Sequence, residues 1–191
     1  MNVCLYGASS NEIDPSYITA TEALGEALAR ADHGLVYGGG GAGLMGAAAR
    51  GMTKGGGCVI GVVPSFLKVD GVLYDHCDEM IYTDTMRQRK QIMEERADAF
   101  IVTPGGIGTY EEFFEIYTLK QLGRHAKHIV IYNINGYYDR MLSMLEHTVA
   151  EGFMRDKSLQ LYTVATTPKQ VLEQLSLTAD AVDINQTKFI R

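Results

Sequence analysis

Short apolar segments alternate with longer amphipathic segments along most of this chain. Runs such as Asn2–Tyr6 end at glycine or proline, which is typical of buried strands. The segments between them carry apolar residues at helical spacing, as Ile18, Leu24 and Leu28 do. The predicted strands are Asn2–Tyr6, Leu35–Tyr37, Cys58–Val63, Glu79–Tyr82, Ala99–Thr103, His128–Tyr132 and Tyr162–Ala165. The predicted helices run from Pro15 to about Arg30, over Ala42–Lys54, from a cap at Asp84 or Thr85 to near Arg96, and over Tyr110–Leu122, Tyr137–Glu151 and Pro168–Leu175.

This alternation predicts a doubly wound α/β fold, with a mostly parallel, Rossmann-like sheet and helices on both of its faces. The pattern fades near the C-terminus, so we expect a single domain over residues 1–175 and a tail over residues 176–191. Ligands of such sheets bind at the carboxyl ends of the strands. Three strand ends are therefore expected to meet at one edge and form a site, namely Gly7–Ser10, Gly38–Gly46 and Pro104–Glu112.

Composition and charge narrow the possible partners. The chain has 17 basic and 23 acidic residues among 191, and its net charge of −6 argues against a nucleic-acid partner. No apolar run approaches the length of a membrane span, and the N-terminus lacks the basic and apolar regions of a signal peptide. The thiols of Cys4, Cys58 and Cys77 have no metal-binding spacing, so we expect no metal site. Scattered thiols fit a reducing, cytoplasmic compartment.

Glycine is enriched and clustered. There are 21 glycines, and Gly41–Gly46 forms a GxGxxG turn between a predicted strand and a predicted helix. A dinucleotide site also requires an acid at the end of the next strand, but the first acid beyond that strand is Asp70, in a loop. The turn therefore argues for an anion more than for NAD, because backbone N–H groups at a helix N-terminus attract phosphate. The alternative is a tight turn needed only for close packing.

A second glycine turn, Pro104–Thr109, leads into the helix that carries Glu111 and Glu112. Only one of these adjacent carboxylates can face the site fully, and acids in a first helical turn can also serve as capping groups alone. The preceding charged helix carries Arg89 shortly before this strand and turn. An arginine there suits phosphate recognition, although a charged helix face is more often just solvated.

Together these residues resemble the LONELY GUY (LOG) family of cytokinin riboside 5′-monophosphate phosphoribohydrolases, many of which are labelled "lysine decarboxylase-like". The resemblance runs from about Val3 to Ala165. The family motif PGGxGTxxE is met in full between Pro104 and Glu112, and its arginine–lysine pair corresponds to Arg89-Lys90. Its GGGxxGLMG segment resembles Gly39–Gly46. The chain departs from the family at Met86-Arg87-Gln88 and in the loop 66–77, where only Asp70 is a counterpart for an acid near the base or ribose.

The resemblance implies an enzyme that hydrolyses the N-glycosidic bond of adenine nucleoside 5′-monophosphates, of the cytokinin type or plain, without a cofactor or a metal. It implies Glu112 beside the ribose as one catalytic residue, and Arg89 as the other, offsetting charge on the departing base or gripping phosphate or ribose. It also implies a homodimer or larger homo-oligomer, with the Glu112 helix near the interface. The implied substrate- or phosphate-binding residues are Gly7, Ser9, Ser10, Gly39, Gly40, Gly41, Gly43, Met45, Gly46, Met86, Lys90, Pro104, Gly105, Gly106, Gly108, Thr109 and Glu111.

Two other functions are compatible with the same glycine-rich edge. One is a carrier of a phosphorylated ligand, similar to molybdenum-cofactor carrier proteins, and the other is a nucleotide sensor without turnover. A decarboxylase is not expected, because neither Lys54 nor Lys90 has the surroundings that a pyridoxal Schiff base requires.

Overall fold

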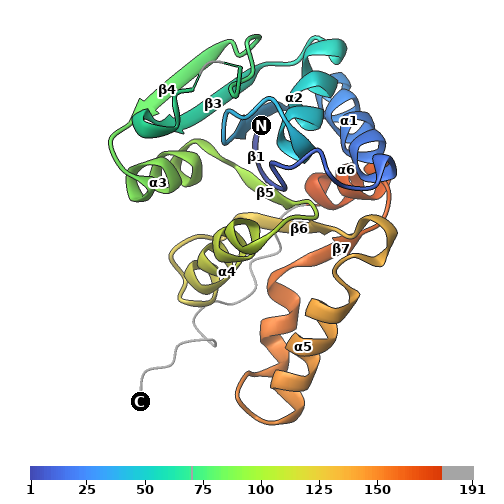
Figure 1. The fold of residues 1–191 in the computed structure, drawn as a ribbon. Coiled ribbons are helices and arrows are strands. Elements are labelled where there is room, and N and C mark those ends of the chain that lie inside the picture. The colour runs from blue at the N-terminus through green and yellow to red at the C-terminus, as the bar shows by residue number, and fades with distance from the viewer. Residues whose placement is uncertain (70, 178–191) are drawn as a thin grey trace.

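Seven parallel strands form one sheet in the computed structural model of this protein, which describes residues 1–69 and 71–177 (Figure 1). The strands are β1 (Asn2–Tyr6), β2 (Gly34–Tyr37), β3 (Val59–Pro64), β4 (Glu79–Thr83), β5 (Ala99–Val102), β6 (His128–Tyr132) and β7 (Thr163–Ala165). Their order across the sheet is β4-β3-β2-β1-β5-β6-β7. The chain builds outward from β1 to β4, returns to the other side of β1, and builds outward again, which confirms the predicted doubly wound topology.

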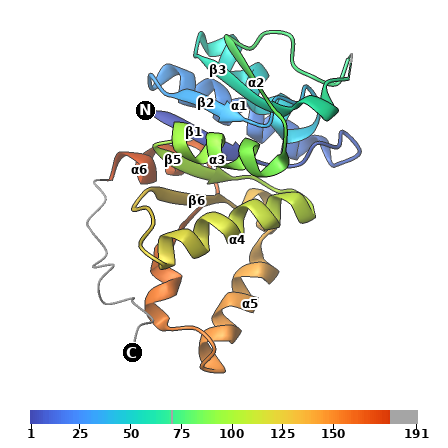
Figure 2. The same ribbon diagram turned by 90° about the vertical axis from the view of Figure 1, so that its left-hand side faces the viewer.

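Helices cover both faces of this sheet (Figure 2). Because side chains alternate along a strand, Val3 and Leu5 of β1 pack toward one group of helices, while Cys4 and Tyr6 pack toward the other. The first core holds residues of α1, α2 and α6, and the second holds residues of α3, α4 and α5. The helices are α1 (Pro15–Arg30), α2 (Gly43–Gly55), α3 (Met86–Arg96), α4 (Ile107–Gln121), α5 (Asp139–Ala150) and α6 (Pro168–Ser176), with short 3₁₀ turns at Ser65–Leu67, Ile134–Gly136 and Asp156–Leu161.

Local sequence signals explain most of the element boundaries. Asp14 caps α1 ahead of its first-turn proline, as the sequence predicts. Of the two candidate caps for α3, Thr85 is the one used, and it forms a capping box with Gln88. Pro64, expected to end β3 from outside, is instead its last residue and aligns with Thr83. A proline is tolerated there because the pairing of β3 with β2 ends at Gly61, so Pro64 pairs on one side only.

Two predicted helix starts are wrong. Helix α4 begins at Ile107, three residues before the predicted Tyr110, because Gly106 adopts the extended N-cap conformation without a side-chain cap. Helix α5 begins at Asp139 rather than Tyr137, because Asn135 adopts a left-handed conformation (φ 53°) in the preceding turn. Both changes matter for function, since they bring Ile107–Thr109 into a helix N-terminus and leave Tyr137 in a turn.

The strand order reverses between β1 and β5, and the loops that follow β1 and β5 meet there. The backbone N–H of Ala8 donates to the Pro104 carbonyl at 3.0 Å, which joins the two loops. A topological switch point of this kind is where open α/β sheets bind ligands. None of the helices in the described ranges is long and apolar enough to cross a membrane. The predicted tail beyond residue 177 lies outside the described residues.

Candidate active site

A buried ion pair joins α3 to α4 at the switch point. Arg89 Nη1 lies 3.3 Å from Glu112 Oε1, and each residue is only 9% exposed. Arg89 Nε also donates to the Val62 carbonyl at 3.1 Å, at the end of β3. The Arg89 guanidinium is therefore held from two sides, by the Val62 carbonyl of β3 and by the Glu112 carboxylate of α4. Burying a charge is costly unless it is paired, so a buried ion pair of this kind contributes little net stability while loss of either partner is strongly destabilising.

The environment of Glu112 raises the pKa of its carboxyl group toward neutral pH. Burial raises the pKa of the Glu112 carboxyl to about 7, although the positive charge of Arg89 opposes this shift. A carboxyl group with a pKa near the working pH is suited to accept and return a proton during catalysis. Perturbed carboxyl groups in clefts are typical of active sites.

The same shift predicts how stability depends on pH. Folded Glu112 binds a proton more tightly than the unfolded chain, whose carboxyl has a pKa near 4.5. The stabilisation is therefore complete below pH 4.5 and is lost as the pH rises to about 7. Chemical denaturation of wild-type protein and Glu112→Gln at pH 4.5 and pH 8 should show wild type losing about 3 kcal/mol relative to the variant. A difference that does not change with pH would contradict the shift.

The first turn of α4 offers unpaired backbone donors to a ligand. No acceptor for the N–H groups of Ile107, Gly108 and Thr109 lies within the described part of the chain, and Gly106 provides no side-chain cap. Such a helix N-terminus attracts anions. A Cβ at Gly105 would overlap the Thr109 hydroxyl, so this approach of turn to helix requires glycine. The turn opens into a cavity of about 220 Å³ lined by Gly7, Ala8, Ser9, Met45, Arg89, Gly106, Gly108, Thr109 and Glu112.

The N-terminus of α2, in contrast, has its donors already occupied. The N–H groups of Leu44 and Met45 both donate to the Ala8 carbonyl, and the Gly43 N–H donates to the Asn11 side chain at 2.8 Å. The Gly46 N–H binds within its own turn. The GxGxxG turn therefore packs against the loop after β1 and presents Met45 to the cavity. This agrees with the packing alternative for the α2 turn, and the α4 turn remains a predicted anion site.

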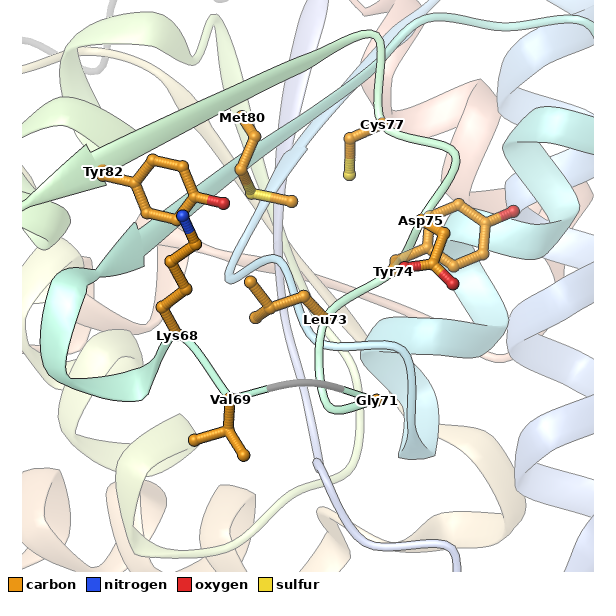
Figure 3. Close-up of a pocket in the computed structure, with 9 residues that line it drawn as sticks. All are labelled: Lys68, Val69, Gly71, Leu73, Tyr74, Asp75, Cys77, Met80 and Tyr82. Carbon is orange, nitrogen blue, oxygen red and sulfur yellow. The ribbon is translucent and has the colours of Figure 1, made fainter.

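The run Gly39–Gly41 does not line this cavity. Gly40 pairs with Leu73, the Gly41 N–H donates to the Val72 carbonyl, and the Tyr74 N–H donates to the Gly39 carbonyl. These bonds attach the loop after β3 to the glycine run. On the far side of the run lies a second cavity of about 510 Å³, where Lys68 sits over the Tyr82 ring and Met80 and Leu73 point inward (Figure 3). Asp70, the predicted counterpart of the family's loop acid, lies outside the described residues.

The adjacent acids of α4 have different partners. Lys90 forms ion pairs with Glu111 and, at 2.7 Å, with Glu115. The side chain of Glu111 is about half exposed, so Glu112 is the member of the adjacent pair that faces the cavity. Lys90, Glu111, Met86, Ser10 and Pro104 do not line this cavity. Their binding roles remain predictions, whereas Arg89, Glu112 and the α4 turn lie together. Residues 1–69 and 71–177 contain no group of three or more His, Cys, Asp or Glu side chains placed to hold a metal ion.

Two contributors to the site were not identified from the sequence. A Cβ at Gly38 would overlap Arg89 Nη2 and lie 3.0 Å from the Met45 sulfur, so this glycine makes room for the guanidinium. The four consecutive glycines in the sequence indicate a close approach of the backbone to another group, but they do not show that this group is Arg89. The hydroxyl of Tyr137 donates to the Gly105 carbonyl at 2.7 Å. Nothing in the local sequence indicates that contact, since 32 positions separate the two residues.

Comparison with known protein families gives a match over most of the chain. The family model described as "Possible lysine decarboxylase" matches residues 45–175. A protein of Oryza sativa subsp. japonica, named as a probable cytokinin riboside 5′-monophosphate phosphoribohydrolase, is 39% identical over 91% of this chain and 71% of its own length. A cytokinin riboside 5′-monophosphate phosphoribohydrolase of Arabidopsis thaliana is 36% identical over 91% of this chain and 81% of its own.

Solved structures with the same fold include proteins of a different kind. The molybdenum cofactor binding protein of Rippkaea orientalis superimposes with a TM-score of 0.67 and 23% identity, covering 90% of this chain and 91% of its own. The molybdenum cofactor carrier protein of Chlamydomonas reinhardtii gives 0.68 and 21%, covering 91% and 96%. At these identities the likeness establishes the shared fold alone.

Proposed function

Because the chain belongs to the LONELY GUY family of phosphoribohydrolases, we propose that its Arg89–Glu112 cavity hydrolyses adenine-type nucleoside 5′-monophosphates. The bond broken is the N-glycosidic bond, and the products are the free base and ribose 5-phosphate. One observation carries this proposal: a buried carboxyl–guanidinium pair shares a small cavity with an open helix N-terminus. The first suits bond cleavage beside a sugar, and the second suits a phosphate group.

We assign the 5′-phosphate to the first turn of α4. Its N–H groups at Ile107, Gly108 and Thr109 are free to donate, and the helix dipole favours a negative group at that end. The cavity of about 220 Å³ is smaller than the roughly 300–1,000 Å³ typical of small-molecule pockets. Ribose and phosphate therefore occupy it, and the base extends out of it.

Glu112 acts on the sugar. Cleavage builds positive charge on the ribose, and a carboxylate beside it stabilises that oxocarbenium-like state. The same carboxylate accepts a proton as water adds its oxygen to C1′ and the C1′–N bond breaks. The departing base then takes up a proton. A pKa of about 7 lets Glu112 accept the proton and release it again near neutral pH.

Arg89 supplies a fixed positive charge. Its bonds to Val62 and Glu112 hold the guanidinium in place before substrate arrives, so little reorganisation is needed when charge develops on the base. The remaining guanidinium donors are free to meet the base, the ribose or the phosphate.

No lysine in the described ranges lines the Arg89–Glu112 cavity, so the site lacks a residue that could form the Schiff base of a pyridoxal-dependent decarboxylase. Lys54 pairs with Glu26 at 3.0 Å on the surface between α1 and α2, and Lys90 is held by Glu111 and Glu115. Neither residue lines the Arg89–Glu112 cavity. The name attached to the family model therefore does not describe the chemistry that these residues support.

We also propose that the enzyme works in the cytoplasm as a homodimer or larger homo-oligomer. Free, scattered thiols support the compartment. Helix α4 supports the assembly, because Phe114 and Leu119 are only partly covered and Leu122 is 57% exposed. An apolar strip of this kind on a helix beside the site is suited to a second copy of the chain.

Turnover separates an enzyme from a carrier or sensor. Purified protein should be incubated with AMP and, separately, with isopentenyladenosine 5′-monophosphate, with chromatographic detection of free base and a parallel binding measurement. The proposal predicts free base from both nucleotides, and the ratio of the rates ranks the two bases. Saturable binding without any free base would instead favour the carrier or sensor alternative.

A further inference from the structure

In the turn between β5 and α4, three consecutive carbonyl groups each accept from a different donor outside the turn and outside α4. The Thr103 carbonyl accepts from the Tyr138 hydroxyl at 2.8 Å. The Pro104 carbonyl accepts from the Ala8 N–H at 3.0 Å. The Gly105 carbonyl accepts from the Tyr137 hydroxyl at 2.7 Å. The orientations of these three peptide planes are therefore set by contacts from the loop after β1 and from the segment before α5.

The third of these bonds has a consequence at the cavity. In a trans peptide the C=O and the following N–H point in opposite directions, and the described residues contain no cis peptide bond. The bond from Tyr137 to the Gly105 carbonyl therefore directs the Gly106 N–H away from Tyr137. Gly106 lines the cavity, immediately before the open N–H groups of α4.

This peptide is also the one in the turn with the greatest freedom to rotate. It is flanked by Gly105 and Gly106, and glycine occupies regions of backbone conformation that other residues avoid. Rotation of the plane would bring the Gly105 carbonyl oxygen toward the anion site and turn the Gly106 N–H away. A carbonyl dipole facing a phosphate repels it, so one hydrogen bond separates an attractive arrangement from a repulsive one.

We propose that Tyr137 is a positioning residue for phosphate recognition, which holds the Gly105–Gly106 peptide with its N–H toward the 5′-phosphate of the substrate. This inference rests on the proposed function, because it assigns the phosphate to the α4 turn. The tyrosine is itself well placed for the role. Its ring packs edge-on against the rings of Tyr138 and of Tyr17 in α1, with ring centroids 4.9 Å and 6.2 Å apart. Burial raises the pKa of the Tyr137 phenol, so the hydroxyl keeps its proton and donates throughout the working pH range.

The neighbouring tyrosine provides a matched control. Tyr138 makes a bond of nearly equal length to the same turn, but the peptide that it fixes is Thr103–Pro104. Proline has no N–H, so loss of that bond removes no donor from the cavity. Tyr137→Phe and Tyr138→Phe therefore each delete one hydroxyl that donates to the turn. Only the first releases a peptide whose N–H belongs to a residue that lines the cavity.

Titration calorimetry with ribose 5-phosphate tests the inference on wild type and both variants. Tyr137→Phe should bind about tenfold more weakly, and its KM for AMP should rise by a similar factor while kcat changes less than about threefold. Tyr138→Phe should have a lower Tm, because the buried Thr103 carbonyl loses its hydroxyl donor. It should still bind ribose 5-phosphate within about twofold of wild type.

Three outcomes would overturn the inference. Wild-type affinity in Tyr137→Phe would show that the peptide keeps its orientation unaided. Equal weakening in both variants would show that the tyrosines only stabilise the turn. Wild-type protein that releases free base from AMP but does not bind ribose 5-phosphate would remove the phosphate from the α4 turn and leave the hydrolase proposal standing. Failure of the hydrolase proposal is seen separately, as the absence of free base from AMP.

Discussion

Replacing Glu112 by glutamine is expected to lower kcat by about 10²- to 10⁴-fold while the fold and the binding of ribose 5-phosphate survive. Glutamine has nearly the same shape and still accepts a hydrogen bond from Arg89, so the contact across α3 and α4 is kept. It can neither take up a proton from water nor place a negative charge beside the ribose. Steady-state release of free base from AMP measures the loss, and calorimetry with ribose 5-phosphate measures the binding.

Glu115→Gln is the matched control for that experiment. Glu115 lies on the same helix one turn away, is bound to Lys90 at 2.7 Å and does not line the cavity. It should keep kcat within about threefold of wild type, because this ion pair lies outside the cavity. Turnover close to wild type in Glu112→Gln, or an equal loss in Glu115→Gln, would remove Glu112 from the chemistry.

Gly38→Ala is expected to lower kcat/KM by about 10²-fold and to lower the Tm without preventing folding, although Gly38 does not line the cavity. The backbone at Gly38 accepts an alanine, because its φ is not in the left-handed region. The new methyl group would overlap the end of the Arg89 side chain, which is flexible and can move aside. The fold thus survives by displacing the guanidinium from Val62 and Glu112. Steady-state kinetics and a thermal unfolding curve on the same preparation measure both effects.

A double-mutant cycle shows whether Gly38→Ala acts through Arg89. In an Arg89→Ala background the guanidinium is absent, so the added methyl group has nothing to displace. The two substitutions should therefore be strongly non-additive, and Gly38→Ala should cost less than about threefold in that background. Additive losses would mean that Gly38 affects the site by another route.

The sheet could be predicted from the sequence because each strand is a short apolar run bounded by glycine, proline or a polar residue. The strand Asn2–Tyr6 was placed without error, and the others within about one residue. Helix starts after glycine turns were harder. Gly106 caps α4 without any side chain, so nothing marked Ile107 as the first helical residue. At α3, by contrast, the Thr85–Gln88 capping box is visible in the sequence itself.

The site could be predicted in part. The resemblance to a family brought Arg89 and Glu112 together before the structure did, although 23 positions separate them. It also gave both glycine turns the same role. Only the long-range contacts distinguish them, because the donors of α2 are occupied by Ala8 and Asn11 while those of α4 stay open. Whether a backbone N–H is already used depends on a partner distant in sequence, and no local pattern reports it.

A comparison of AMP with adenosine is the sharpest test of whether hydrolysis depends on the 5′-phosphate. Purified wild-type protein should be given AMP and adenosine at equal concentration, and adenine and ribose 5-phosphate should be measured together. We expect adenine and ribose 5-phosphate in equal amounts from AMP, and at least about 10²-fold less adenine from adenosine, because adenosine has no group for the α4 turn. Equal release of adenine from both, or none from AMP, would contradict this expectation.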